Sequence, residues 1–216
     1  FAFGEILERV FETNKEFGMV GQGLTKITAQ ATFLEVLLEG SREAASELSA
    51  NLGGTEEVSL RLNLATAAIA NNMGISASES AGLVTSFMLL NKGSEDTALN
   101  LIKSSQQLAI QNGIIPAQLM ADLAKSTEEF ALFGEDGGEN IVRAAAFARK
   151  LGVEISQIAG VAENLLDFES SISKELELSA MLGRNINLQK ARQLAFDNDL
   201  EGATKEVLKQ IGGINE

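Results

Sequence analysis

The acidic stretch FDNDLEG, residues 196–202, has the residue types and spacing that open a calcium-binding loop. An EF-hand loop supplies oxygen ligands from positions 1, 3 and 5, needs glycine at position 6 for a sharp turn, and closes with a bidentate glutamate at position 12. Positions 1, 3, 5 and 6 are filled by Asp197, Asp199, Glu201 and Gly202. Position 12 is Leu208, which has no oxygen to offer. A link between two helices explains the same residues, because Asp199 is a good N-cap and Glu201 favours the positive end of a following helix. We predict the link and no metal site.

Two further stretches carry carboxylates in patterns that chemistry could use. The loop EDGGEN, residues 135–140, could hold a cation, but acidic residues around a glycine pair before an apolar run are more typical of a turn and a helix start. The stretch DFES, Asp167 to Ser170, faintly resembles the Glu-Ser step of lytic transglycosylases, in which a carboxylic acid protonates a glycosidic oxygen. The aromatic and glycine-rich motifs that should follow it are absent. We therefore interpret DFES as a polar stripe of a long helix.

The remaining residue types exclude most catalytic chemistry. The chain contains no cysteine and no histidine, so disulfides, zinc sites and Ser-His or Cys-His nucleophiles are ruled out. The stretch GMVGQG, residues 18–23, lacks the lysine and the serine or threonine of a phosphate loop, and its glycines are in the wrong order for a dinucleotide turn. We predict no catalytic, cofactor-binding or metal-binding residue, no cofactor and no enzymatic activity.

The charge of the chain limits its partners. A formal net charge of −13 over 216 residues repels nucleic-acid backbones and anionic lipid head groups, so we expect no stable nucleic-acid binding by this segment. No run of 18 apolar residues is present, so we expect no membrane span. The first residue is Phe1 rather than methionine, which suggests a segment of a longer chain.

The elements that position these residues are predicted to be helices throughout. Alanine, leucine, glutamate and glutamine are spread along the chain, and β-branched residues do not alternate with polar ones over any long stretch. Helix starts are marked by Thr55, Ser76, Ser94, Pro116 and Ser126, of which Ser76 and Ser126 have the capping-box spacing to a glutamate. Helix ends are marked by Gly40, Gly74, Gly93, Gly113, Gly152, Gly183 and Gly212. We predict about ten helices, the longest from about residue 155 to 182, a rod of roughly 40 Å.

Three of these glycines are evenly spaced. Gly74, Gly113 and Gly152 lie 39 residues apart (113 − 74 and 152 − 113), and each precedes a β-branched residue. Small residues follow eight positions later, at Gly82, Ala121 and Gly160. They would let another helix approach closely. A period near 40 residues that contains two helices is typical of an array of helical hairpins. Chance is the alternative, since 20 glycines make some equal spacings expected.

The predicted fold is therefore all-α, an array of helical hairpins with a possible 39-residue repeat, followed by a long helix and short C-terminal helices. N-terminal helices occupy residues 1–54, and the helical repeat region occupies residues 55–152. The long helix and a C-terminal helical hairpin occupy residues 153–216.

The last third of the chain, Ala148 to Gly213, resembles a segment of the tail tape measure proteins of tailed bacteriophages. Its recognisable pieces are LLDFESSI at 165–172, LGRNINLQKAR at 182–192, FDNDLEG, and TKEVLKQIG at 204–212. The region around GISASESAGL, residues 74–83, is similar to the helical repeats of the same proteins, although it is much less distinctive.

This resemblance implies a long helical chain in the lumen of the tail tube, whose length sets the length of the tube and which leaves ahead of the DNA at infection. The implied partners are further copies of the chain in a symmetric oligomer, a trimer or a hexamer, and tail tube, distal tail or baseplate hub proteins. The implied location is the virion, in the tail lumen or tail tip, and the host cytoplasm during assembly. The family has no shared catalytic residues to carry over.

A second interpretation stays open, in which the chain is an α-helical repeat adaptor that binds a protein partner in a groove of its repeats. A tail segment should be oligomeric or poorly soluble when isolated. An adaptor should instead be a monomer with an exposed apolar groove.

Overall fold

A computed structural model describes residues 28–53 and 58–212, with side chains from residue 40 onward. Every regular element in these residues is an α-helix, and they contain no strand, so the predicted all-α fold class is confirmed. None of the helices described is long and apolar enough to cross a membrane. The helices expected in residues 1–27, the stretch GMVGQG and the helix start expected at Thr55 lie outside the described residues.

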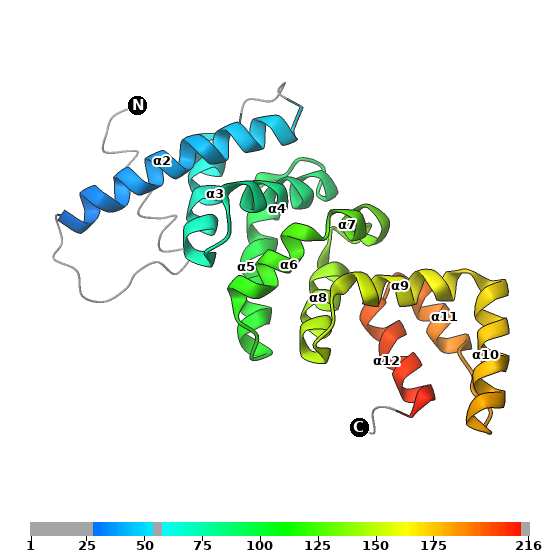
Figure 1. Cartoon of the computed structure of the whole chain (residues 1–216). Coiled ribbons are helices and arrows are strands. Elements are labelled where there is room, and N and C mark those ends of the chain that lie inside the picture. Colours follow the sequence, from blue (N-terminus) through cyan, green and yellow to red (C-terminus); the bar gives the residue numbers. More distant parts are fainter. Residues whose placement is uncertain (1–27, 54–57, 213–216) are drawn as a thin grey trace. The chain divides into compact units, whose positions relative to one another are not determined.

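The chain divides into two compact units, and the first ends at Lys125. The described helices of this unit are α2 (Thr28–Asn51), α3 (Leu60–Met73), α4 (Ala77–Leu90), α5 (Glu95–Gln111) and α6 (Pro116–Lys125). Each helix packs against the next one along the chain, and α4 also contacts both α2 and α6 (Figure 1). The core of this unit includes the fully buried Ile69, Phe87 and Ile102, which come from α3, α4 and α5.

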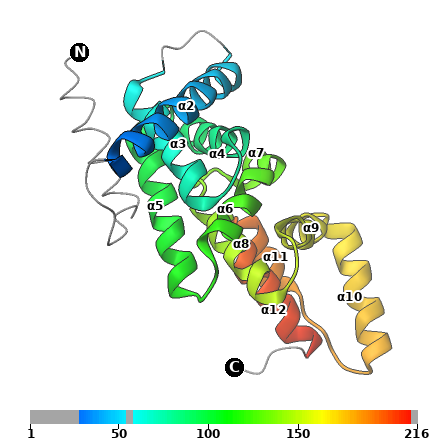
Figure 2. The ribbon, with the colours of Figure 1, turned by 60° about the vertical axis from the view of Figure 1, so that its left-hand side comes forward.

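The second unit begins at Ser126. It contains α7 (Thr127–Phe133), α8 (Glu139–Leu151), α9 (Ile155–Leu166), α10 (Phe168–Leu182), α11 (Gln189–Phe196) and α12 (Leu200–Ile211). Helix α9 lies at its centre, because α8, α10, α11 and α12 all pack against it (Figures 1 and 2). The apolar face of α9, with Ile158 and Ala162, is buried together with Leu200 and Ala203 of α12.

Gly74, Gly113 and Gly152 end helices in the same way. Each has a left-handed backbone, with φ of 62°, 69° and 72°. The N–H of the residue after each glycine donates to a carbonyl five positions back, at 3.2, 2.9 and 3.0 Å. The accepting residues are Ala70, Ala109 and Ala148. This Schellman geometry needs a residue that tolerates positive φ, so the predicted helix ends at these three glycines are confirmed.

One predicted helix end, at Gly40, is wrong, and the start predicted at Ser126 is correct but lacks its predicted cap. Gly40 lies inside α2, where a Cβ at its position would be 3.6 Å from the Cβ of Ala67 in α3. This glycine therefore lies where two helices approach each other closely. Ser126 precedes α7, but its side chain does not cap the helix. The capping box at Ser76 and Glu79 and the start of α6 at Pro116 are confirmed.

The single long helix predicted for residues 155–182 is wrong. The chain bends between α9 and α10 at Asp167, where ψ is 84°, far from the helical value. The Asp167 carboxylate accepts a hydrogen bond from the backbone N–H of Ser170 at 3.3 Å and thereby begins α10 as a separate helix. Both views of the ribbon show α10 leaving the line of α9 (Figures 1 and 2).

The 39-residue repeat stays a prediction. Most consecutive helices pack against each other in both units, although α10 and α11 do not, and this agrees with a helical-hairpin array. However, residues 75–113 contain two helices, α4 and α5, whereas residues 114–152 contain three, α6 to α8. The predicted boundary after residue 152 also differs from the division into units, because α8 packs with α9 and α12.

Candidate functional site

The FDNDLEG stretch forms the link between α11 and α12. Asn198 has a left-handed φ of 64°, and the N–H of Asp199 donates to the Leu194 carbonyl at 2.8 Å, which closes α11. The Asp199 carboxylate then accepts from the Gly202 N–H at 2.9 Å and caps α12. A Cβ on Gly202 would collide with that carboxylate. The cap therefore explains the glycine, and the predicted N-cap at Asp199 is confirmed.

The other acidic groups of the link bond to side chains of their own helices. Asp197 accepts from the Gln193 amide at 3.0 Å, and Glu201 pairs with Lys205 at 2.8 Å. Among the side chains described, those of residues 40–53 and 58–212, no group of three or more acidic side chains is placed to hold a metal ion. The arrangement of FDNDLEG is that of a joint between helices.

Two contacts anchor this joint to distant parts of the second unit. The Asn198 amide donates to the Phe133 carbonyl at the end of α7, at 3.0 Å. The Leu200 N–H donates to the side-chain oxygen of the buried Asn140, at 3.2 Å. The first turn of α12 is thereby held against the beginning of α8.

The EDGGEN loop has the structure that the sequence analysis favoured, a turn followed by a helix start. The Asp136 carboxylate accepts from the N–H groups of Gly138 and Asn140, at 3.0 and 2.8 Å. Gly137 and Gly138 have positive φ, and α8 begins at Glu139. The Asp136 carboxylate thus satisfies backbone donors at the start of α8.

The DFES stretch lies at the bend between α9 and α10 rather than on a polar stripe of a continuous helix. Asp167 is the N-cap of α10, and Ser170 supplies the backbone N–H that it binds. Phe168 and Glu169 are exposed. The stretch therefore shapes a joint, as FDNDLEG does.

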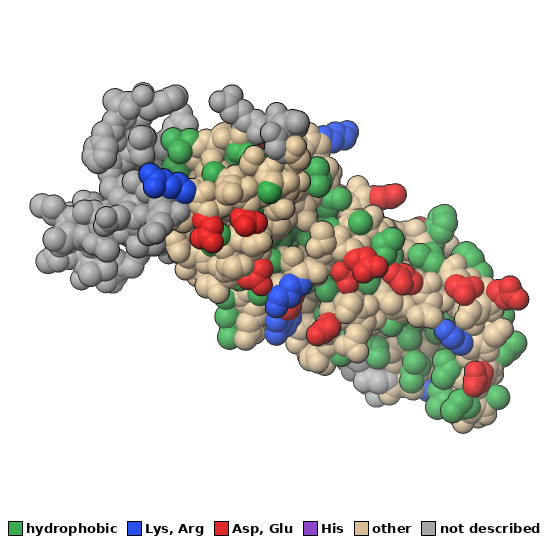
Figure 3. Space-filling view, turned by 45° about the horizontal axis from the view of Figure 1, so that its top comes forward, with side chains coloured by type: hydrophobic (Ala, Val, Ile, Leu, Met, Phe, Trp, Pro, Cys, Tyr) green, Lys and Arg blue, Asp and Glu red, His purple; other side chains and the backbone are tan. Residues whose placement is uncertain are grey.

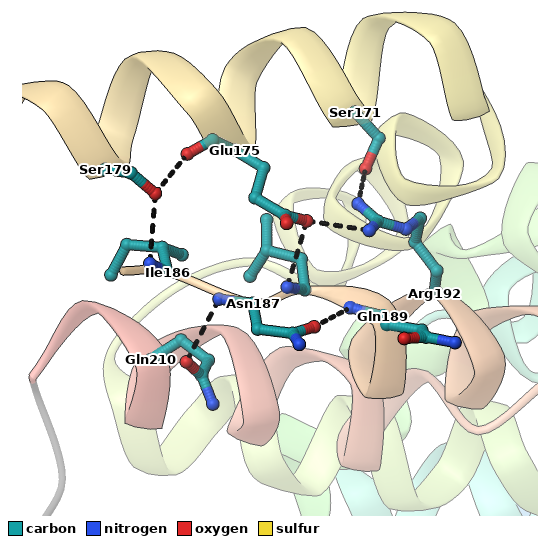
Figure 4. A network of polar contacts seen from close by, with 9 residues as sticks. Ser171, Glu175, Ser179, Ile186, Asn187, Gln189, Arg192 and Gln210 are labelled. Atoms are coloured by element: carbon teal, nitrogen blue, oxygen red, sulfur yellow. Dashed lines mark hydrogen bonds and ion pairs between the residues drawn. The ribbon is translucent and has the colours of Figure 1, made fainter. Parts of the chain in front are cut away.

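A polar network holds α10 to the chain that follows it (Figure 4). Glu175 accepts from the Arg192 guanidinium at 2.7 Å and from the Leu188 N–H at 3.0 Å. Arg192 also donates to the Ser171 hydroxyl at 3.1 Å. The Glu175 and Arg192 side chains are only 19% and 11% exposed. This pair is therefore shielded from water far more than an ordinary surface ion pair.

The network continues along the link between α10 and α11. Ser179 donates to the Glu175 carbonyl at 2.8 Å and accepts from the Ile186 N–H at 3.0 Å. Arg184 donates to the Gln210 carbonyl of α12 at 2.8 Å. The Ile186 bond, with that of the Leu188 N–H to Glu175, satisfies backbone donors of the link that lie outside any helix.

Sequence reasoning missed this network, although α10 carries a signal for it. Ser171, Glu175 and Ser179 are spaced four residues apart and therefore share one face of the helix. Among the side chains of α10, only Ser171 is fully buried. A helix whose packed face is polar binds its neighbours through hydrogen bonds rather than through apolar burial.

An open groove of about 400 Å³ lies beside this network. Its apolar lining includes Val161 and Leu165 of α9, Leu178 of α10 and Val207 of α12. At its edge, Lys174 donates to the Asn164 side chain at 2.7 Å. Gly160 also lines the groove, and a Cβ at its position would meet nothing within 4 Å. Close contact at Gly160 with another helix stays a prediction.

Helix α10 also exposes apolar side chains. Phe168, Ile172 and Leu176 follow each other at intervals of four residues and are 52%, 49% and 67% exposed. The face of the molecule in Figure 3 shows hydrophobic side chains interspersed with acidic and basic ones. The chemistry that the groove and α10 offer is contact with an apolar partner, because the Glu175 carboxylate is already bonded by Arg192 and Leu188.

Compared with known proteins, the chain matches no family model, no curated protein and no solved structure.

Proposed function

We propose that this chain is a structural segment of a phage tail tape measure protein, located in the tail lumen or tail tip, where it helps to set the tail length and leaves during genome ejection. The observation that carries the proposal is the resemblance of residues 148–213 to such proteins, through LLDFESSI, LGRNINLQKAR and FDNDLEG.

The positions of those pieces support a structural role. LLDFESSI spans the bend between α9 and α10, LGRNINLQKAR spans the link into α11, and FDNDLEG joins α11 to α12. All three lie within one compact unit. Their distinctive residues, such as Asp167, Arg192 and Asp199, bond to the backbone or to other side chains of that unit.

The surface of the chain supports the proposed partners. The exposed Phe168, Ile172 and Leu176 offer apolar area to further copies of the chain or to tail tube and hub proteins. The net charge of −13 disfavours adhesion to DNA, so the chain and the genome can pass through the same tube without binding each other.

The proposal is tested on purified particles of a phage that encodes the full-length chain. Quantitative mass spectrometry should detect this segment in intact virions. The segment should be absent from tails that have ejected their DNA. Its absence from intact virions would overturn the proposal.

The adaptor interpretation is favoured by one observation, the apolar lining of the groove between α9, α10 and α12. An adaptor acts outside the particle, so it would be found in infected cells and not in purified virions. The same measurement therefore separates the two functions.

A further inference from the structure

Helices α9 and α10 carry one continuous apolar pattern although the chain bends between them. Ile158, Ala162 and Leu165 form the buried face of α9. At helical spacing this face continues through Ile172 and Leu176, which are exposed in the bent chain. No glycine or proline lies between Gly160 and Gly183. The residue types therefore permit one helix across the bend.

The bend itself is confined to a single residue. The Asp167 N–H still bonds the Glu163 carbonyl at 3.1 Å, and the Asp167 carbonyl accepts from the Ser171 N–H at 2.8 Å, as in a continuous helix. At Asp167, φ is −76° and close to the helical value, whereas ψ is 84° and departs from it. Straightening would pair the N–H groups of residues 168–170 with the carbonyls of residues 164–166.

Straightening favours the movement of α11 and α12 along with α10. A straight α10 would place its end about 22 Å beyond the bend, and the seven Cα–Cα steps from residue 182 to residue 189 reach at most about 25 Å when fully extended. Helices α11 and α12 pack against α9 on the near side of the bend. They could remain there only with the link stretched to almost its full length, which would break its bonds to α10 and α12.

Helices α10 to α12 are also bonded together as one module. Glu175 and Ser171 of α10 bond Arg192 of α11, and Arg184 of the link bonds Gln210 of α12. Toward α9, the described polar contact of α10 is the bond from Lys174 to Asn164. Rotation at Asp167 would therefore preserve the polar contacts of α10 with α11 and the link. It would break the packing of α10, α11 and α12 against α9 and the contacts of α12 with α8.

We propose that Asp167 is a hinge for domain swapping, and that two copies of this chain exchange their α10–α12 modules to form a dimer in which α9 and α10 are one helix. In the dimer, the module of one copy binds α7, α8 and α9 of the other, through the bonds that Asn198 and Leu200 make within one chain and the packing of α11 and α12 on α9. Short hinges between packed elements are where such exchange occurs.

The exchange also accounts for the apolar side chains that α10 leaves exposed. The two continuous helices of a reciprocal dimer pass each other beside the two-fold axis, which lies near the two hinges. Phe168, Ile172 and Leu176 follow the hinge directly and lie where these helices meet. The inference does not depend on the proposed tail function.

The test uses the 216-residue chain refolded at high and at low concentration, with its mass measured by light scattering. Refolding at high concentration should yield a dimer. Asp167→Ala removes the cap and should raise the dimer association constant roughly tenfold. Phe168→Pro is the matched control, because proline is tolerated at the first position of α10 but not inside a continuous helix. The Phe168→Pro chain should remain monomeric at both concentrations.

A distance measurement distinguishes the swap from ordinary association. The chain has no cysteine, so spin labels can be placed at Ser156→Cys and Glu177→Cys, two exposed positions on α9 and α10. In dimers diluted with unlabelled chain, pulsed EPR should find about 32 Å between them, the span of a straight helix, and a shorter distance in the monomer. A dimer with the monomer's distance would overturn the inference. The inference would also be overturned if the Asp167→Ala chain stayed monomeric at high concentration. It would equally be overturned if a folded Phe168→Pro chain formed the dimer as readily as wild type.

Discussion

Gly202 shows what the link between α11 and α12 requires of its residues. A Cβ on Gly202 would collide with the Asp199 carboxylate, so a larger residue there would displace the cap of α12. An acidic residue followed by glycine serves a helix cap in this chain, and the same residue types open an EF-hand loop. Leu208 has no side-chain oxygen to bind a metal ion, and this and the capping role of Asp199 could both be predicted from the sequence.

The tertiary hydrogen bonds of that link could not be predicted from the sequence. Asn198 and Leu200 bond Phe133 and Asn140, which are 65 and 60 residues away along the chain. Nothing local in FDNDLEG indicates those partners. Arg192 and Glu175 were missed for the same reason, since a charged residue on a helix is more often solvated than buried in a pair.

Glu206 provides a test of the packing around α12. A hydrogen bond from Gln210, followed by one from Lys190, lowers the pKa of the Glu206 carboxyl below its ordinary value of 4.5. A carboxyl whose pKa is lower in the folded state stabilises the fold above its unfolded pKa, and this contribution is lost as the pH falls through the folded value. An NMR titration of Glu206 should therefore have its midpoint below 4.5.

The matched variant is Gln210→Ala, which removes the first of these causes and should raise the Glu206 midpoint toward its ordinary value. The advantage of wild type over Glu206→Gln in the free energy of unfolding should also shrink as the pH falls through the folded pKa. A midpoint at or above 4.5 in wild type would contradict the contacts described for Glu206.

At the scale of elements, helix ends were the most predictable feature. Glycines at positive φ end α3, α8, α10 and α12 where the sequence analysis expected them. The ends follow from local chemistry, since a left-handed residue is needed whatever the helix packs against. Gly40 was misjudged because its role is tertiary, the close approach of α2 to α3.

Two glycines test this distinction. Gly113→Ala should lower the free energy of unfolding by about 1 kcal/mol, because φ at Gly113 is 69° and alanine is strained there. Gly82→Ala is the control, since Gly82 lies inside α4 and a Cβ there would meet nothing within 4 Å. It should raise stability by roughly 0.5–1 kcal/mol. Urea unfolding measures both changes, and equal effects of the two substitutions would contradict the assignment of Gly113 as a helix end.

The bend between α9 and α10 could not be predicted from local pattern. Residues 155–182 have the apolar periodicity of one helix. Two helices are favoured by the N-cap at Asp167, by the bonds that Arg192 and Leu188 donate to Glu175 and by the packing of α10 on α9. These bonds depend on where α11 lies. The helix break at Asp167 was not predicted, and Leu176 is exposed, for the same reason: the sequence is compatible with both a bent and a straight helix.

At the scale of the whole molecule, composition was sufficient for the fold class but not for the division into units. Helix-favouring residues throughout the chain predicted the all-α fold. The boundary was placed after residue 152, yet α8 belongs with the second unit because it packs against α12, some 50 residues later. Pairings between distant helices are not encoded in local periodicity.

The proposed tail function predicts that length is the property of the whole chain that matters most. A tape measure segment laid along the tube as one continuous helix, rather than packed as in the units described above, contributes about 1.5 Å of tail per residue. Residues 75–113 are a suitable unit to remove or duplicate, because either change still joins a glycine to a β-branched residue at the helix end. The rest of the sequence is unaltered in both variants, although α4 and α5 contribute to the core of the first unit.

The measurement that tests this claim most directly is the tail length, by electron microscopy, of phage carrying the full-length chain with residues 75–113 deleted or duplicated. The account predicts tails about 60 Å shorter and about 60 Å longer than wild type. Assembled tails of unchanged length in both variants would contradict it.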